Sequence, residues 1–151
     1  MNFYDGLVIK KLDPSASIAL IPLLVDLGYP HQDAETLQRR IVLFLSNSNS
    51  WLYGYIDNEE LIGFGALSFI PLIHEDGYLA RVSALAVKKS YQGQGVGKQL
   101  MNHMESICLA KGCSRIELTS GAHRESTAHQ FYLRIGYEKS TSARFVKTWG
   151  G

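Results

Sequence analysis

The fold of this chain is decided by the stretch ALAVKKSYQGQGVGK, residues 84–98, which runs from apolar residues through glycines into a helical pattern. Residues 80–87 are mostly short, apolar or β-branched, and this composition predicts a buried strand. Beyond the glycines, apolar side chains recur at helical spacing, at Val96, Leu100, Met104, Ile107 and Cys108. The stretch therefore predicts a strand, a glycine-rich turn and a helix, in that order.

The turn carries three glycines in five positions, Gly93, Gly95 and Gly97. Glycine lets the backbone turn tightly and approach a ligand closely, and the start of a helix presents unpaired N–H groups that attract anions. The turn is therefore a candidate phosphate site, and the alternative is that the glycines only make a tight turn in an ordinary α/β protein.

The glycine spacing excludes two common nucleotide-binding patterns. The dinucleotide fingerprint spaces its glycines G-x-G-x-x-G, and the phosphate loop of nucleotide hydrolases requires G-x-x-x-x-G-K followed by Ser or Thr. Here Gln99 follows Lys98, so neither pattern fits. A nucleotide-binding domain of another α/β fold is thus disfavoured.

Two stretches resemble the GNAT family of N-acetyltransferases. The pattern Gln92-x-x-Gly95-x-Gly97, directly after Leu85-Ala86-Val87, resembles the acyl-CoA pyrophosphate loop of that family. Residues 128–137, AHQFYLRIGY, resemble its last helix, with paired aromatics and a terminal Gly-aromatic pair. The resemblance implies an acetyl-CoA-dependent N-acetyltransferase.

Length and composition indicate one domain over residues 1–151. The chain is 46% hydrophobic and 19% charged, and it contains no apolar run of the 18 or so residues that span a membrane. A net charge of +1 argues against nucleic acid as a partner. Two cysteines without an N-terminal signal pattern favour a cytoplasmic location, and the histidine spacing predicts no metal site.

Periodicity and turn residues predict the remaining elements. We expect a strand over 7–12, helices over 13–27 and from 33 to 45, and an antiparallel hairpin of strands 51–56 and 61–69. A loop over 70–77 precedes the central strand, which begins at residue 78, and after the motif helix come a strand over 115–120, a helix capped by Ser126 and a closing strand over 143–147. This order is that of the GNAT fold, an α/β (α+β) architecture with a mixed twisted sheet, splayed central strands and helices on both faces.

The resemblance also implies how acetyl-CoA, the co-substrate, is held. Backbone groups of Leu85, Ala86 and Val87 would hold the pantetheine, and the N–H of Val87 would meet the thioester carbonyl. The pyrophosphate would lie in the loop formed by Gln92, Gly93, Gln94, Gly95, Val96, Gly97 and Lys98. The basic groups near this end that could reach CoA phosphates are Lys98 first, then Lys88, Lys89, His129 and Arg134, although exposed solubilising charge explains each equally well.

Two catalytic roles need residues of their own. The resemblance implies that Tyr132 on the last helix faces the thioester end, where it would give a proton to the departing CoA thiolate, since a phenol remains protonated at neutral pH. The alternative is that its ring only packs between helix and sheet. Many family members carry a glutamate early in the central strand, but here Arg81 and Ser83 occupy the corresponding positions. The candidate bases, acting directly or through water, are therefore Glu75 and Asp76, beside His74 in the preceding loop, or Glu117 on the next strand.

The phrase ELTSG over residues 117–121, together with Arg124 and the last helix, resembles small-amine acetyltransferases of the aminoalkylphosphonate and aminoglycoside type. The predicted acceptor is a primary amine of a small molecule, attacking directly in a ternary complex, with Arg124 facing an anionic group of substrate or cofactor. The alternatives are a protein or peptide N-acetyltransferase, or a non-catalytic acyl-CoA-binding or regulatory module that has lost the base. Family habit suggests a homodimer.

Overall fold

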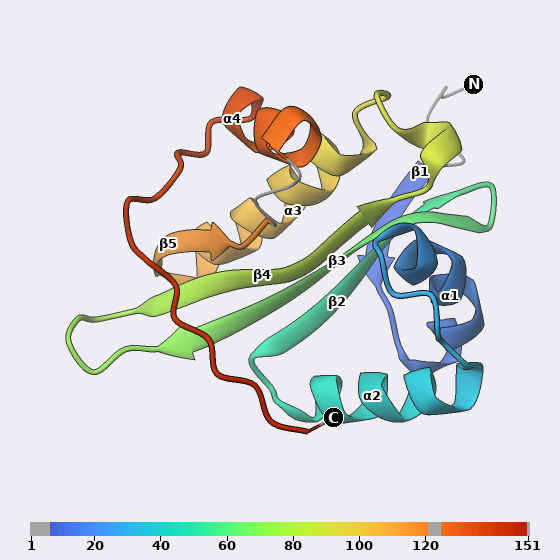
Figure 1. Cartoon of the computed structure of the whole chain (residues 1–151), viewed down its shortest axis with the longest axis horizontal. Coiled ribbons are helices and arrows are strands. Elements are labelled where there is room, and N and C mark those ends of the chain that lie inside the picture. Colours follow the sequence, from blue (N-terminus) through green and yellow to red (C-terminus); the bar gives the residue numbers. More distant parts are fainter. Residues whose placement is uncertain (1–6, 121–124, 151) are drawn as a thin grey trace. The chain divides into compact units, whose positions relative to one another are not determined.

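The computed structural model describes residues 7–120 and 125–150 and divides into two compact units, Met1–Thr119 and Ser120–Gly151. The first unit contains a five-stranded sheet, in which the strands lie in chain order (Figure 1). Neighbouring strands are antiparallel except for β5, which runs parallel to β4. The strands are β1 (Leu7–Lys11), β2 (Ser50–Asp57), β3 (Glu60–Pro71), β4 (Tyr78–Val87) and β5 (Cys113–Leu118).

The hairpin of β2 and β3 is confirmed. Asn58 and Glu59 form its two-residue turn, with φ values of 48° and 70° that match the twist of a tight hairpin. β5 was predicted over 115–120, but it begins at Cys113, which pairs with Tyr78, and ends at Leu118. This earlier end of β5 bears directly on the candidate site.

The helices of the first unit follow the predicted boundaries closely. A 3₁₀ turn (Pro14–Ala16) leads into α1 (Ser17–Asp26), and Asp33 accepts a hydrogen bond from the Thr36 N–H at 2.9 Å to cap α2 (Ala34–Ser46). α3 (Val96–Lys111) follows a second short 3₁₀ turn (Lys89–Tyr91). Gly112, with a φ of 82°, ends α3.

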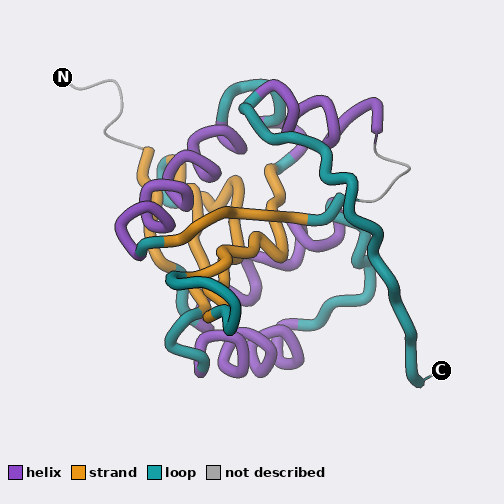
Figure 2. The backbone as a smooth tube through the Cα atoms, turned by 90° about the vertical axis from the view of Figure 1, so that its left-hand side faces the viewer, coloured by secondary structure: helices purple, strands orange, loops and turns teal. Residues whose placement is uncertain are grey.

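Helices cover both faces of the sheet (Figure 2). α1 and α2 pack on one face through Leu20, Leu23, Leu37 and Ile41, which form a core with Leu52, Phe64, Ala66 and Ala86. α3 packs on the other face, where a Cβ on Gly65 would lie 2.7 Å from Cε of Met104. The glycine in β3 therefore lets α3 approach the sheet closely. Cys108, one of the apolar residues at helical spacing, is buried on α3, and burial raises the pKa of its thiol to about 12.

In the second unit, a π-helical turn (Glu125–His129) continues as α4 (Gln130–Arg134), and Gly136, with a φ of 99°, follows its end. Ser126 lies inside this helical segment, and its predicted capping role stays a prediction. The strand predicted over 143–147 is also wrong, because residues 137–150 contain no strand. Phe145 is 93% exposed and Val146 is 68% exposed, so no burial favours the alternating pattern there.

The close approach of Gly77 to Gly112 predicts that a side chain at residue 77 lowers the stability of the fold. Gly77 has a φ of +88°, and a Cβ at this position would lie 2.5 Å from the Gly112 carbonyl oxygen. We expect Gly77→Ala to lower the free energy of unfolding by about 3 kcal/mol, because it adds a backbone clash to left-handed strain. Gly28→Ala is the matched control, since Gly28 also has positive φ (+110°) but nothing within 4 Å. Strain alone costs this control about 1 kcal/mol in urea unfolding, and equal losses in the two variants would contradict the clash.

Candidate active site

β4 and β5 separate halfway along β4. Their pairing runs from Tyr78 opposite Cys113 to Val82 opposite Leu118, where β5 ends. β4 continues for five residues, 83–87, with β3 on one side and no strand of the described chain on the other. Because a strand directs backbone N–H and C=O groups toward both neighbours, residues 83–87 present groups along this open edge that pair with no described strand. Among them, the Val87 carbonyl oxygen accepts a hydrogen bond from the Gln92 side chain. We call this opening the fork.

A β-bulge lies where the fork begins. Ala66 pairs with Ala84 and Leu67 pairs with Val82, so Ser83 is an extra residue in β4. Ser83 is exposed, whereas Ala86 is buried in the core beneath α1 and α2. Bulges re-aim side chains and occur preferentially next to active sites.

The glycine-rich loop follows the open edge of β4 and is braced by its own side chains. Nε2 of Gln92 donates to the Val87 carbonyl oxygen at 3.1 Å, and Nε2 of Gln94 donates to the Ser90 carbonyl oxygen at 3.1 Å. Gly93 and Gly95 have φ values of 79° and 86°, which glycine adopts at little cost. Since both glutamine side chains donate inside the loop, the backbone N–H groups are the loop's candidate donors to an anion.

The start of α3 supplies those donors. Gly95 is the N-cap and brings no capping side chain, and the first helical N–H to find a partner is that of Gln99, which donates to the Gly95 carbonyl at 3.0 Å. The N–H groups of residues 96–98 thus have no partner within the helix, and the dipole of a 16-residue helix favours an anion beside them. A Cβ on Gly95 would meet only Nε2 of Gln99, at 3.9 Å, so the space in front of the loop is open.

Two contacts tie this loop to the β2–β3 hairpin. Lys88 forms an ion pair with Glu60, which raises the pKa of the lysine. The Tyr91 hydroxyl donates to Oδ2 of Asp57 at 3.2 Å, and this hydrogen bond raises the pKa of the phenol. Lys88 is therefore engaged by the hairpin, whereas Lys98 is exposed on the first turn of α3 and has no ion-pair partner in the part of the chain described here.

Among the three candidate bases, the structure brings Glu117 to the fork. Its Oε1 accepts from Nη1 of Arg81 at 3.2 Å, and its Oε2 lies 3.9 Å from Nε of Arg115. Nη2 of Arg81 donates to Oγ1 of Thr119 at 2.6 Å. Thr119 is the first residue beyond β5, so the Arg81 guanidinium reaches the point where the two strands part.

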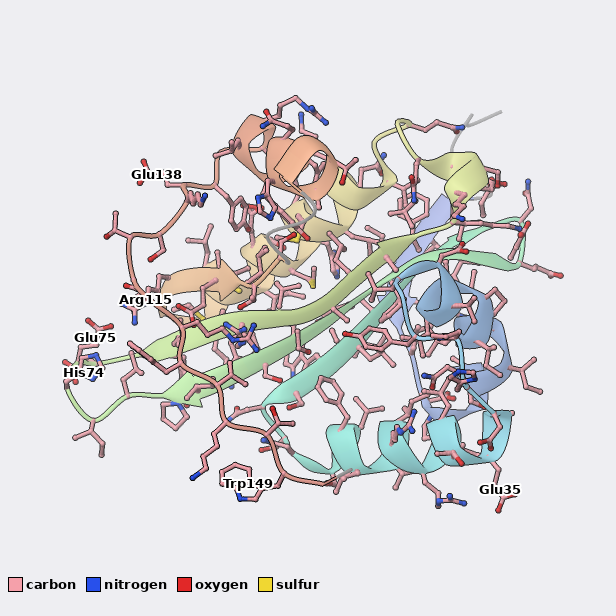
Figure 3. All side chains as sticks on the ribbon, viewed as in Figure 1. Glu35, His74, Glu75, Arg115, Glu138 and Trp149 are labelled. Atoms are coloured by element: carbon pink, nitrogen blue, oxygen red, sulfur yellow. The ribbon has the colours of Figure 1, made fainter. Side chains whose placement is uncertain are left out.

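Glu75 and Asp76 lie farther away, in the exposed loop between β3 and β4. Figure 3 shows His74 and Glu75 at the outer end of this loop, near the start of β5. Oε1 of Glu75 accepts from the Ser114 hydroxyl at 3.0 Å, and Ser114 precedes the end of β5 by four residues, about 13 Å of strand. These two carboxylates are therefore not assembled with Glu117.

The predicted residues of the second unit are found on one short helical segment. The Tyr132 ring lies 5.1 Å from that of Phe131 and 6.0 Å from that of Tyr137, and all three side chains are half-buried. The roles assigned to Tyr132 and His129 stay predictions. Arg124, predicted to face an anionic group, lies outside the described residues.

Residues 7–120 and 125–150 contain neither a candidate metal centre nor a candidate membrane span. No three His, Cys, Asp or Glu side chains there are grouped to hold a metal ion. None of the helices described is long and apolar enough to cross a membrane.

Comparison with known proteins relates the chain to acetyltransferases. A model of the acetyltransferase (GNAT) family matches residues 19–137. The aminoalkylphosphonate N-acetyltransferase of Salmonella typhimurium is 32% identical over 90 residues, which are 60% of this chain and 57% of that enzyme. The match thus spans little more than half of the relative's length.

Solved structures show the same architecture. A transcriptional regulator from Bacillus halodurans superposes with a TM-score of 0.84 at 21% identity, covering 94% of this chain and 99% of the other. An aminoglycoside N-acetyltransferase in complex with CoA superposes with a TM-score of 0.81 at 15% identity, covering 94% of each chain. At these identities the likeness establishes the fold that the element order predicted.

Proposed function

Since this chain belongs to the acetyltransferase (GNAT) family, we propose that it moves an acetyl group from acetyl-CoA to a primary amine of a small molecule. One observation carries the proposal: the open edge of β4 leads directly into a braced glycine loop and an uncapped helix start. The open edge of β4 suits an extended arm that carries amide groups. The glycine loop and the helix start suit a pyrophosphate. Together they suit the two ends of one acyl-CoA molecule.

Each part of the site has a defined task in this proposal. The open edge at Leu85, Ala86 and Val87 would hold the pantetheine arm by backbone hydrogen bonds, as a neighbouring strand would. The Val87 N–H would stabilise negative charge on the thioester oxygen during attack. Residues 92–98 would hold the pyrophosphate, with Lys98 as the side-chain cation. When bound, acetyl-CoA supplies the activated acyl group.

The amine must lose a proton before it attacks, because its ammonium form has no free electron pair. We favour Glu117 as the acceptor of that proton, directly or through a water, because it lies at the fork, whereas Glu75 is held about 13 Å along the strand. Tyr132 would return a proton to the thiolate. A small-molecule acceptor is supported by the two relatives that act on aminoalkylphosphonates and aminoglycosides.

The rival reading is an acyl-CoA-binding module without catalysis. Arg81, in the place of the usual strand glutamate, is the observation that favours it. A thiol-release assay separates the two, with acetyl-CoA and a panel of aminoglycosides, aminophosphonates, polyamines, amino acids and peptides. We expect release of free CoA with at least one small amine, and acetyl-CoA binding without release across the panel would support the binding module. A cytoplasmic location and a homodimer stay predictions.

The phosphate-site assignment predicts the effect of a charge at Gly95. We expect Gly95→Glu to weaken acetyl-CoA binding at least about tenfold in calorimetry, because the new carboxylate occupies and repels the phosphate position at the helix start. Gly112→Glu is the matched control. It adds the same charge at the other end of α3, where φ is also positive (+82°) and nothing lies within 4 Å. Equal affinities in Gly95→Glu and the unmodified protein would remove the loop from the site.

The acid role of Tyr132 predicts a loss of turnover without a loss of binding. We expect Tyr132→Phe to lower kcat about 100-fold or more while acetyl-CoA affinity stays nearly constant, because only the hydroxyl is removed. Tyr137→Phe is the control, since its ring lies 6.0 Å from that of Tyr132 on the same segment. If Tyr132→Phe retains full turnover while chemistry limits the rate, Tyr132 has only a packing role.

A further inference from the structure

We propose that Arg81 and Arg115, the arginine pair, recognise an acidic group on the amine substrate at the base of the fork. The ligand class is a small primary amine that carries a phosphonate or carboxylate. This inference rests on the proposed function and narrows its substrate class. It is carried by the register of β4 and β5, the charges gathered there, and the donors that remain on Arg81.

The parallel register places the relevant side chains together. Arg81 lies opposite Glu117, and two residues earlier on each strand Leu79 lies opposite Arg115. Because side chains alternate along a strand, Arg81, Arg115 and Glu117 share one face of the sheet. Ala80 and Val82 therefore point to the other face. Ser114 is the extra residue at the register shift before Leu79, and its hydroxyl holds the Glu75 carboxylate.

The charges on this shared face do not cancel. Two guanidinium groups surround one carboxylate, with Nη1 of Arg81 at 3.2 Å from Oε1 and Nε of Arg115 at 3.9 Å from Oε2. An ordinary surface pair in this chain, Arg39 with Glu35 on α2, matches one cation with one anion. The β4–β5 cluster thus retains a net positive charge, which favours a further anion beside it.

Arg81 is held in place and still has donors to offer. A guanidinium carries five N–H groups, and Glu117 and Thr119 each accept one from Arg81. The side chain is 33% exposed, so the remaining donors are accessible but their orientation is fixed. A planar guanidinium with several free N–H groups binds phosphonate or carboxylate oxygens in pairs.

The position of the cluster makes it part of the transfer site. The Arg81 guanidinium reaches Thr119, where β5 ends and the open edge of β4 begins. The exposed hydroxyl of Ser83 lies two residues farther along β4, in the bulge. An acidic group bound here anchors one end of the substrate while its amine extends along the fork toward residues 84–87.

Calorimetry on the full chain saturated with free CoA tests the proposal. The probes are 2-aminoethylphosphonate and β-alanine, each paired with an uncharged counterpart, the phosphonate dimethyl ester and β-alaninamide. We expect at least one acid to bind about tenfold or more tightly than its counterpart. The two pairs decide between phosphonate and carboxylate.

Charge variants then locate the effect. We expect Arg81→Gln to weaken binding of the preferred acid about 10- to 100-fold, and Arg115→Gln to weaken it less, because Arg115 acts by offsetting Glu117. Glu117→Gln keeps an acceptor for Arg81 and removes the competing charge, so it should tighten binding. Arg39→Gln, the control on α2, should leave the acid-to-neutral affinity ratio unchanged. Thermal unfolding checks each variant, and Arg115→Gln and Glu117→Gln carry the test if Arg81→Gln does not fold.

The outcomes separate this inference from the proposed function. Equal affinity for acids and neutral counterparts, no binding of either, or a preference that the arginine and Glu117 variants leave unchanged overturns the inference. If CoA thiol is still released with neutral amines, the proposed function stands alone. If the acid binds through the arginine pair and no amine releases thiol, the anion site stands and the transferase proposal fails.

Discussion

The constraint on which the site depends is the unequal length of two paired strands. β5 ends at Leu118, opposite Val82, while β4 continues to Val87 because β3 still pairs with it on the other side. Because β3 holds β4 along one edge, the remaining N–H and C=O groups of β4 must face the opposite, open edge. The open edge of β4 is therefore a consequence of sheet register, and it needs a ligand or water to satisfy it.

Close packing of α3 places the second half of the site beside the first. Gly63 and Gly65 thin β3 where α3 crosses it, and added Cβ atoms there would approach Leu100 and Met104 to about 3 Å. The same helix begins at the glycine loop, so its packing fixes its N-terminus next to the end of β4. The loop is held in turn by Gln92, whose amide bonds the Val87 carbonyl. One helix thus links core packing to the anion site that we propose.

Sequence patterns predicted the local parts of this arrangement well. The loop and α3 depend on residues adjacent in the chain, and their glycines and helical spacing carried the information. The Arg81–Glu117 pair joins residues 36 apart through a parallel register that no local pattern encodes. The strand expected over 143–147 failed for a related reason: alternation indicates that a segment can form a strand, but a strand also needs a neighbour to pair with.

The charge balance at the fork decides which part of a substrate Arg81 can serve. Arg81 and Arg115 carry two positive charges against the single carboxylate of Glu117, so the cluster attracts an acidic substituent. Once that substituent is bound, the positive charge of the cluster is offset, and the cluster no longer repels the ammonium form of the amine. The amine must therefore lose its proton to a separate group, and Glu117, one strand away and bonded to Arg81, lies beside that path. In our proposal, the arginine in the place of the family's usual glutamate thus serves substrate recognition, and proton removal passes to the neighbouring strand.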